Sequence, residues 1–94
     1  MGFKAAKAAL INALKNGNYQ HAERGSIDVK NLLAIGRVTA EELIEVIKRC
    51  DGTQHSCSKH HQVKELDVHL IKCNEWYVRF FFITPDVWFI SVHQ

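Results

Sequence analysis

The feature that most constrains this fold is a change in the spacing of apolar residues near Val63. Before that point, apolar residues recur every three or four positions, as in helices with one buried face. From Val63 to His93 they alternate with mostly polar residues, a period of two that is typical of strands with one buried face. The sequence therefore predicts an α+β fold in which N-terminal helices pack on a C-terminal sheet.

Helices are expected over about residues 3–50. The first should end at Gly17, because glycine suits the left-handed residue that follows a helix. Asp28 can cap a short second helix that Gly36 would close.

Thr39 and Glu42 have the spacing of a capping box, which predicts the start of a third helix. A short extended piece is expected around Tyr19, and a polar, histidine-rich loop over residues 51–62. Helices, loop and sheet together make a single domain, residues 1–94.

Three alternating segments joined by two short connections predict a three-stranded antiparallel β-meander over residues 63–93. All three strands must turn their apolar sets to one face, because a slip of one residue turns every side chain to the other face. That condition requires connections of odd length. Residues 72–74 and 84–86 satisfy it as three-residue turns.

This register aligns the remaining side chains in rows on the second face of the meander. The predicted rows are His69–Tyr77–His93, Asp67–Arg79–Ser91 and Glu65–Phe81–Phe89. Directly opposed side chains have Cβ atoms roughly 5 Å apart, so each row should form a cluster. Exposed aromatic residues beside basic ones can stack unpaired bases, although a helix or partner covering that end is the plainer alternative.

The first two rows contain the residue types that RNA cleavage requires. Attack by the ribose 2′-OH needs a base for that hydroxyl, an acid for the leaving oxygen and positive charge near the phosphate. His93, His69, Tyr77 and Arg79 supply these groups. The simpler interpretation is that they are ordinary solvent-facing residues, and residue type alone favours it.

Other chemistries have weaker support. The segment from His55 to His61 is dense in potential zinc ligands, but its spacing matches no C-x-x-C or H-E-x-x-H pattern. Cys57 has histidine neighbours but no glycine-rich elbow that would indicate a nucleophile. No glycine-rich phosphate loop is present. Neither a metal nor another cofactor is expected.

Composition excludes some classes of protein but does not indicate a function. The chain has 94 residues and a formal net charge of +2, too small to indicate nucleic-acid binding by itself. No apolar run approaches the ~20 residues that span a bilayer, so no membrane partner is expected. Three cysteines at irregular spacings indicate no disulfide framework. A reducing, cytoplasmic location is therefore the expectation.

Five segments carry a family resemblance: residues 11–17, 33–36, 66–69, 77–79 and 86–93. They resemble the motility quorum-sensing regulator (MqsR) toxins, within the RelE-like group of bacterial mRNA interferases. The resemblance implies helices followed by an antiparallel sheet, cleavage of mRNA, and a cognate antitoxin protein as partner.

The resemblance also implies roles for individual residues. Tyr77 falls on a catalytic tyrosine of the family, and His93 falls where the family has a catalytic lysine. Leu66 departs from the family pattern, which has a functional glutamine there. A further family lysine has no direct match; residues 55–58 occupy that region, and His55 or Lys59 could substitute for it.

The sequence thus predicts a toxin-like endoribonuclease that works without a metal. His93 would be the general base or acid, Tyr77 and His69 would assist, and Arg79 would bind the phosphate. Five residues are expected to contact RNA: Lys64, Phe81, Phe89, His55 and Lys59. The alternative is a non-catalytic protein- or RNA-binding module that uses the face or edge of the sheet.

Overall fold

The structure is a computed structural model that describes residues 2–22, 31–51, 55–59, 63, 65–73 and 75–94. Within these residues the chain forms two helices and five strands. In chain order they are α1 (Phe3–Asn16), β1 (Tyr19–His21), α2 (Ala40–Lys48), β2 (His55–Lys59), β3 (Asp67–Cys73), β4 (Trp76–Ile83) and β5 (Asp86–His93). The predicted α+β class is confirmed.

The strands form one mixed sheet in the order β1-β5-β4-β3-β2. β3, β4 and β5 pair antiparallel, as the predicted meander requires, and β1 lies parallel to β5 at one edge. β2 pairs antiparallel with β3 at the other edge, so the prediction of a loop throughout residues 51–62 is wrong. β2 has no apolar alternation that could have predicted it, because all five of its residues are polar or small.

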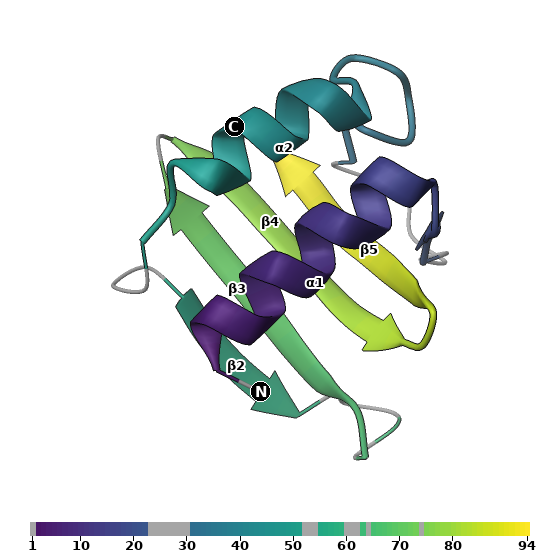
Figure 1. Ribbon diagram of the computed structural model, residues 1–94, viewed down its shortest axis with the longest axis vertical. Coiled ribbons are helices and arrows are strands. Elements are labelled where there is room, and N and C mark those ends of the chain that lie inside the picture. Colours follow the sequence, from purple (N-terminus) through teal and green to yellow (C-terminus); the bar gives the residue numbers. More distant parts are fainter. Residues whose placement is uncertain (1, 23–30, 52–54, 60–62, 64, 74) are drawn as a thin grey trace.

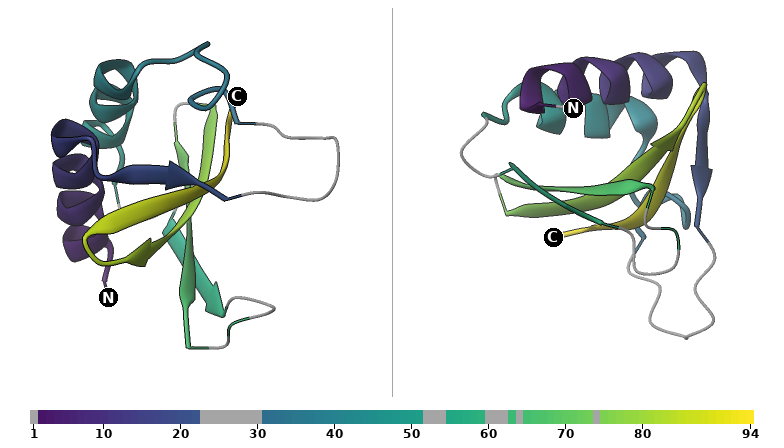
Figure 2. Two further views of the ribbon diagram at one scale, coloured as in Figure 1. Left: turned by 90° about the vertical axis from the view of Figure 1, so that its right-hand side faces the viewer. Right: turned by 90° about the horizontal axis from the view of Figure 1, so that it is seen from below.

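Both helices cover the same face of the sheet, which gives the molecule two layers (Figures 1 and 2). The core lies between the layers. Leu10 and Leu14 of α1 and Ile47 of α2 pack there against Val78 and Phe80 of β4. The opposite face of the sheet, away from the helices, is called the outer face below.

The predicted helix ends are largely confirmed. Gly17 follows α1 with a φ of 73°, a left-handed conformation that costs glycine little. Thr39 and Glu42 form the expected capping box, with both of its hydrogen bonds at 3.1 Å. Each end therefore satisfies backbone groups that a helix leaves unpaired.

The short helix expected before Gly36 does not form. Residues 32–36 make turns instead, and the Asn31 side-chain oxygen accepts a hydrogen bond from the Ala34 N–H at 3.0 Å. Such local side-chain bonds compete with helix formation. Gly36 still closes the segment, with a φ of 79°, while Asp28 lies outside the described residues.

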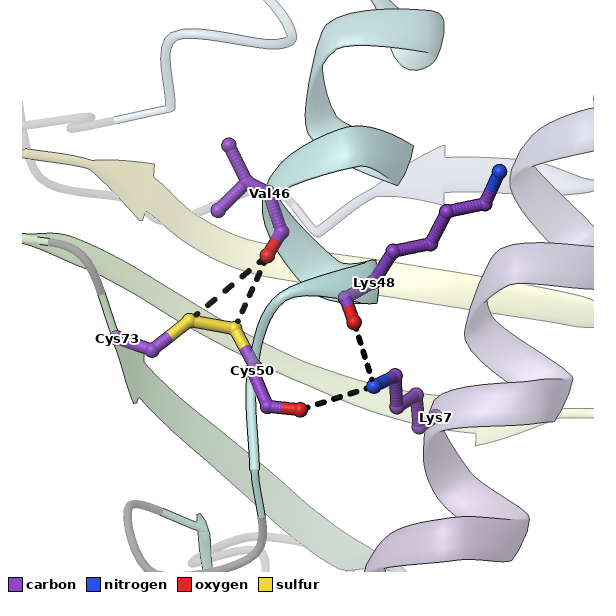
Figure 3. The surroundings of a disulfide bond; sticks show 5 residues. All are labelled: Lys7, Val46, Lys48, Cys50 and Cys73. Atoms are coloured by element: carbon purple, nitrogen blue, oxygen red, sulfur yellow. Dashed lines mark hydrogen bonds between the residues drawn. A yellow bond between two sulfur atoms is a disulfide. The ribbon is translucent and has the colours of Figure 1, made fainter.

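A disulfide joins Cys50, just after α2, to Cys73 at the end of β3, with a Cα–Cα distance of 5.7 Å (Figure 3). The interpretation that the cysteines form no disulfide is therefore wrong, because residues 23 positions apart meet only once α2 lies over the sheet. Beside it, the Lys7 amine donates to the Lys48 and Cys50 carbonyls at 2.9 Å each. The end of α2 is thus connected to both α1 and β3.

The connections of the meander are shorter than predicted. The predicted three-residue turn at 72–74 would place Leu70 opposite Trp76. Instead Cys73 pairs with Trp76, and Leu70 lies opposite Arg79. This shift of three positions is odd, and an odd shift turns every side chain of β3 to the other face. The left-handed residue of this turn is Glu75, with a φ of 68°.

The turn between β4 and β5 is also shorter, but a second irregularity compensates for it. The predicted three-residue turn at 84–86 would place Phe82 opposite Trp88, but Phe82 pairs with Val87. A β-bulge between Arg79 and Phe80 then adds one residue on β5. Beyond the bulge, Tyr77 lies opposite His93, as the sequence predicts.

Candidate functional site

Three rows of side chains cross the outer face. They are Lys72–Tyr77–His93, Leu70–Arg79–Ser91 and Phe81–Trp88. Adjacent rows lie two residues apart along β4, which corresponds to about 7 Å. On β5 the bulge separates Ser91 from Trp88 by three residues. Neither helix covers this face, as the right-hand view of Figure 2 shows.

The first row contains two stacked rings. The centroids of Tyr77 and His93 are 4.8 Å apart and their planes differ by 15°. The Lys72 amine lies 5.8 Å from the centre of the Tyr77 ring, within the range of a cation–π contact. A phenol, an imidazole and an ammonium group therefore share one row.

The hydrogen bond made by His93 identifies its free nitrogen. Its Nδ1 lies 3.2 Å from the backbone oxygen of Gln94, and a backbone oxygen can only accept. Nδ1 therefore carries the hydrogen. In the neutral ring this leaves the lone pair on Nε2, where it can accept a proton.

Arg79 supplies the charge of the second row. It lies opposite Ser91, as predicted, and is half-buried. Within the described part of the chain, its guanidinium forms no ion pair. Its five donors suit the oxygens of a phosphate, which they can bind in pairs.

The third row is aromatic. Phe81 and Trp88 stack with centroids 6.2 Å apart and planes 5° apart. Phe81 is only 6% exposed, whereas Trp88 is half-buried. Phe81, predicted as an exposed RNA contact, is therefore buried beside Trp88, and Trp88 is the more accessible ring of the row.

His69 does not join this site, so its predicted place in the first row is wrong. The odd register shift turns it to the helix side, where it is 2% exposed and stacks on Phe80 at 5.4 Å. Its Nδ1 lies 3.0 Å from Nε2 of His55, and the two imidazoles stack at 5.3 Å. These two residues are called the His55–His69 pair below.

Burial sets the protonation of the His55–His69 pair. Desolvation lowers the pKa of both rings, and for His69 the neighbouring charge of His55 lowers it further. Two neutral imidazoles can share one hydrogen bond, one donating and the other accepting. His55, predicted as an RNA contact, therefore packs on the helix side, where its ring also lies 5.5 Å from that of Phe3.

The remaining predicted residues lie apart from the outer-face rows. Phe89 is fully buried in the core, because the shorter turn exchanges its face with that of Trp88 and the compensating bulge lies beyond it. Lys59 is exposed and pairs with Asp67 at 2.7 Å. The hydrogen bond between them raises the pKa of Lys59 and lowers that of Asp67. The predicted Asp67–Arg79 row does not form, because the register shift places Leu70 opposite Arg79. Lys64 lies outside the described residues.

No group of three His, Cys, Asp or Glu side chains that could hold a metal occurs in the described ranges. Cys57 is an exposed free thiol opposite His69 in the register. His60 and His61, in the segment from His55 to His61 that is dense in potential zinc ligands, lie outside the described residues.

Two members of the outer-face site were missed by sequence reasoning. Alternation predicts Trp88 on the apolar side of its strand, and the three-residue turn places Lys72 in the connection. The observed positions of both residues follow from shorter turns, whose length alternation does not report. The one available signal was that a two-residue turn is a common hairpin connection.

Comparisons with protein-family models, with curated proteins and with solved structures found no match. Among the described residues, no helix is long and apolar enough to cross a membrane.

Proposed function

We propose that the outer face binds single-stranded RNA and cleaves it at the Tyr77–His93 pair. The observation that carries the proposal is this stacked pair, with Lys72 in the same row and Arg79 in the next. A proton acceptor, a hydroxyl donor and two cations lie on a face that neither helix covers. This is the set of groups that RNA cleavage by its own 2′-OH requires.

In the proposed reaction, Nε2 of His93 removes the proton of a ribose 2′-OH. The freed oxygen attacks the adjacent phosphorus, and the bond from phosphorus to the 5′-oxygen breaks. The Tyr77 hydroxyl donates a proton to that leaving oxygen, while Arg79 and Lys72 offset the charge on the phosphate. The products are a 2′,3′-cyclic phosphate and a 5′-hydroxyl end.

The resemblance to MqsR-type toxins supports the same reaction. Tyr77 and His93 are the two positions that the resemblance assigned to catalysis. His69 is no longer needed for it. The proposal therefore includes a cognate antitoxin as protein partner and a cytoplasmic location. The location rests only on where mRNA is available, because the Cys50–Cys73 disulfide removes the argument from cysteine usage.

The non-catalytic alternative also has one observation in its favour. β2 is an edge strand of the described sheet, and four of its five residues are exposed. Edge strands can pair with a segment of another protein. β3 and β4 separate this edge strand from β5, which carries His93. Protein binding at the edge and RNA cleavage at His93 are therefore compatible in one chain.

The test uses the purified protein and a 5′-labelled single-stranded RNA of mixed sequence. We expect fragments that end in a 2′,3′-cyclic phosphate and form equally in the presence of a chelator. His93→Ala should slow cleavage by about 10²- to 10⁴-fold, the range measured for loss of a general base. Tyr77→Phe should also slow it.

Ser56→Ala, on the outer side of β2, is the matched control and should cleave normally. RNA that binds but remains intact would favour the non-catalytic module. Cleavage that survives in His93→Ala at the native rate would rule out the proposed base.

A further inference from the structure

The Phe81–Trp88 row has no role in the cleavage reaction, yet it lies on the same face. Trp88 is half-buried, and its ring lies parallel to that of its cross-strand neighbour Phe81, which is 6% exposed. The parallel arrangement of the two rings fixes the plane of the indole. A large, flat aromatic surface is thereby held in one orientation beside a basic site.

Charge on the outer face changes from basic to acidic along the strands. The first two rows carry Lys72, Arg79 and His93, and none of their described members is acidic. The first carboxylate of this face is Asp86, which lies opposite Ile83 beyond the aromatic row. Phosphates are therefore attracted to the first two rows and repelled past the third.

We infer that Trp88 stacks on an unpaired base of the RNA strand whose phosphates lie on Arg79 and Lys72. This inference rests on the proposed function and adds the nature of the substrate. Tyr77 and Phe81 are four residues apart on one strand, which corresponds to about 13 Å. The stacked base therefore belongs to a nucleotide close to, but not at, the scissile phosphate.

Single-stranded RNA fits this arrangement better than a duplex. Stacking on a protein ring needs a base that is free of its neighbours, and paired bases in an A-form helix are not available in this way. Stacking tolerates any base, because every base has an aromatic face. Trp88 should thus increase affinity without demanding one particular sequence.

Intrinsic fluorescence tests the inference directly, because the chain has two tryptophans. Trp76 packs against the core on the helix side, so Trp76→Phe leaves Trp88 as the sole indole. The probe is a 2′-O-methyl oligoribonucleotide of mixed sequence, which the proposed reaction cannot cleave. We expect it to quench Trp88, and an abasic strand of equal length to bind without quenching.

Affinity provides the second measurement. Trp88→Leu should weaken binding of the same oligonucleotide about tenfold, in line with the loss of one base–aromatic stack. Trp88→Phe should lose less, and the melting temperature of each variant verifies its fold. Ser58→Ala, on the outer side of β2, is the control with unchanged affinity expected.

The outcomes separate this inference from the proposed function. Salt-dependent binding and RNA cleavage with no quenching, together with native affinity in Trp88→Leu, would overturn the stacking role alone. Quenching without any cleavage of ordinary RNA would support the stacking role and overturn the proposed reaction. No binding by the native chain would overturn both, and would point to a protein as the occupant of this face.

Discussion

The two faces of the sheet each carry a stacked pair that contains histidine. On the outer face, the rings of Tyr77 and His93 lie 4.8 Å apart and both are half-buried. On the helix side, the rings of His55 and His69 lie 5.3 Å apart, and His69 is 2% exposed. Similar side chains in similar contacts therefore occupy opposite environments in one small domain.

Burial, rather than residue type, therefore distinguishes a structural histidine from one that is available for chemistry. Burial lowers the pKa of His69 and holds its ring neutral among aromatic neighbours. His69 then acts as a flat, hydrogen-bonded core residue. His93 faces the solvent side with Lys72 and Arg79 in adjacent positions, where a phosphate could reach it.

The largest expected difference between the two pairs is in stability, which truncating each histidine in turn can measure. His69→Ala should lower the free energy of unfolding by about 3 kcal/mol, because it leaves a cavity against Phe80 and removes the hydrogen-bond partner of His55. His93→Ala should change it by less than about 0.5 kcal/mol, as for most surface substitutions. Urea unfolding followed by circular dichroism measures both.

His69→Gln is the control, because glutamine can still form a hydrogen bond with His55 and should therefore lose less stability than alanine. Equal losses for His69→Ala and His93→Ala would mean that the two pairs do not differ as described.

A smaller effect concerns pH. The folded-state pKa values of His55 and His69 lie below the ordinary value of 6.5. Between the lowered values and 6.5, the unfolded chain binds more protons than the folded one, so stability rises with pH. We expect the melting temperature to fall as the pH is taken from about 7.5 to about 5, the window in which histidines titrate.

His69→Gln should reduce this pH dependence, because its side chain does not titrate. A residual slope is expected from His55 and from His21, whose pKa is also lowered by burial. Asp67 affects a separate range, since its pKa lies below 3.8 and its contribution is lost only in stronger acid. A melting temperature as high at the acid end as at neutral pH would contradict a buried neutral pair.

The helical part of the fold could be predicted because its signals are local. Gly17 and the Thr39 capping box each specify a helix end from a few neighbouring residues, and the structure has both. The antiparallel order of β3, β4 and β5 could also be predicted, since three alternating segments with short connections leave few other arrangements.

The faces of the strands could not be predicted reliably, because they depend on single-residue differences in turn length. The turn between β3 and β4 is shorter than predicted, so β3 presents its other face and His69 lies in the core. On β5, the bulge restores the predicted register for His93. Phe89 lies between the turn and the bulge, so its predicted face is wrong. Alternation is equally consistent with either face when both contain aromatic residues, as β4 and β5 do here.

The smallest expected effect sharpens the outer half of the comparison. Lys72 lies over the Tyr77 ring, whereas Lys4 is exposed on α1, on the other side of the sheet. If phosphates bind on the outer face, Lys72→Ala should weaken binding of single-stranded RNA a few-fold and lower the slope of log Kd against log salt by about 0.7, the release of one counterion. Lys4→Ala removes the same charge and should leave the slope unchanged, which a fluorescence-anisotropy titration at several salt concentrations can measure. Equal slopes for the two variants would show that Lys72 contributes only its charge to the whole molecule, and would place the phosphate contacts elsewhere.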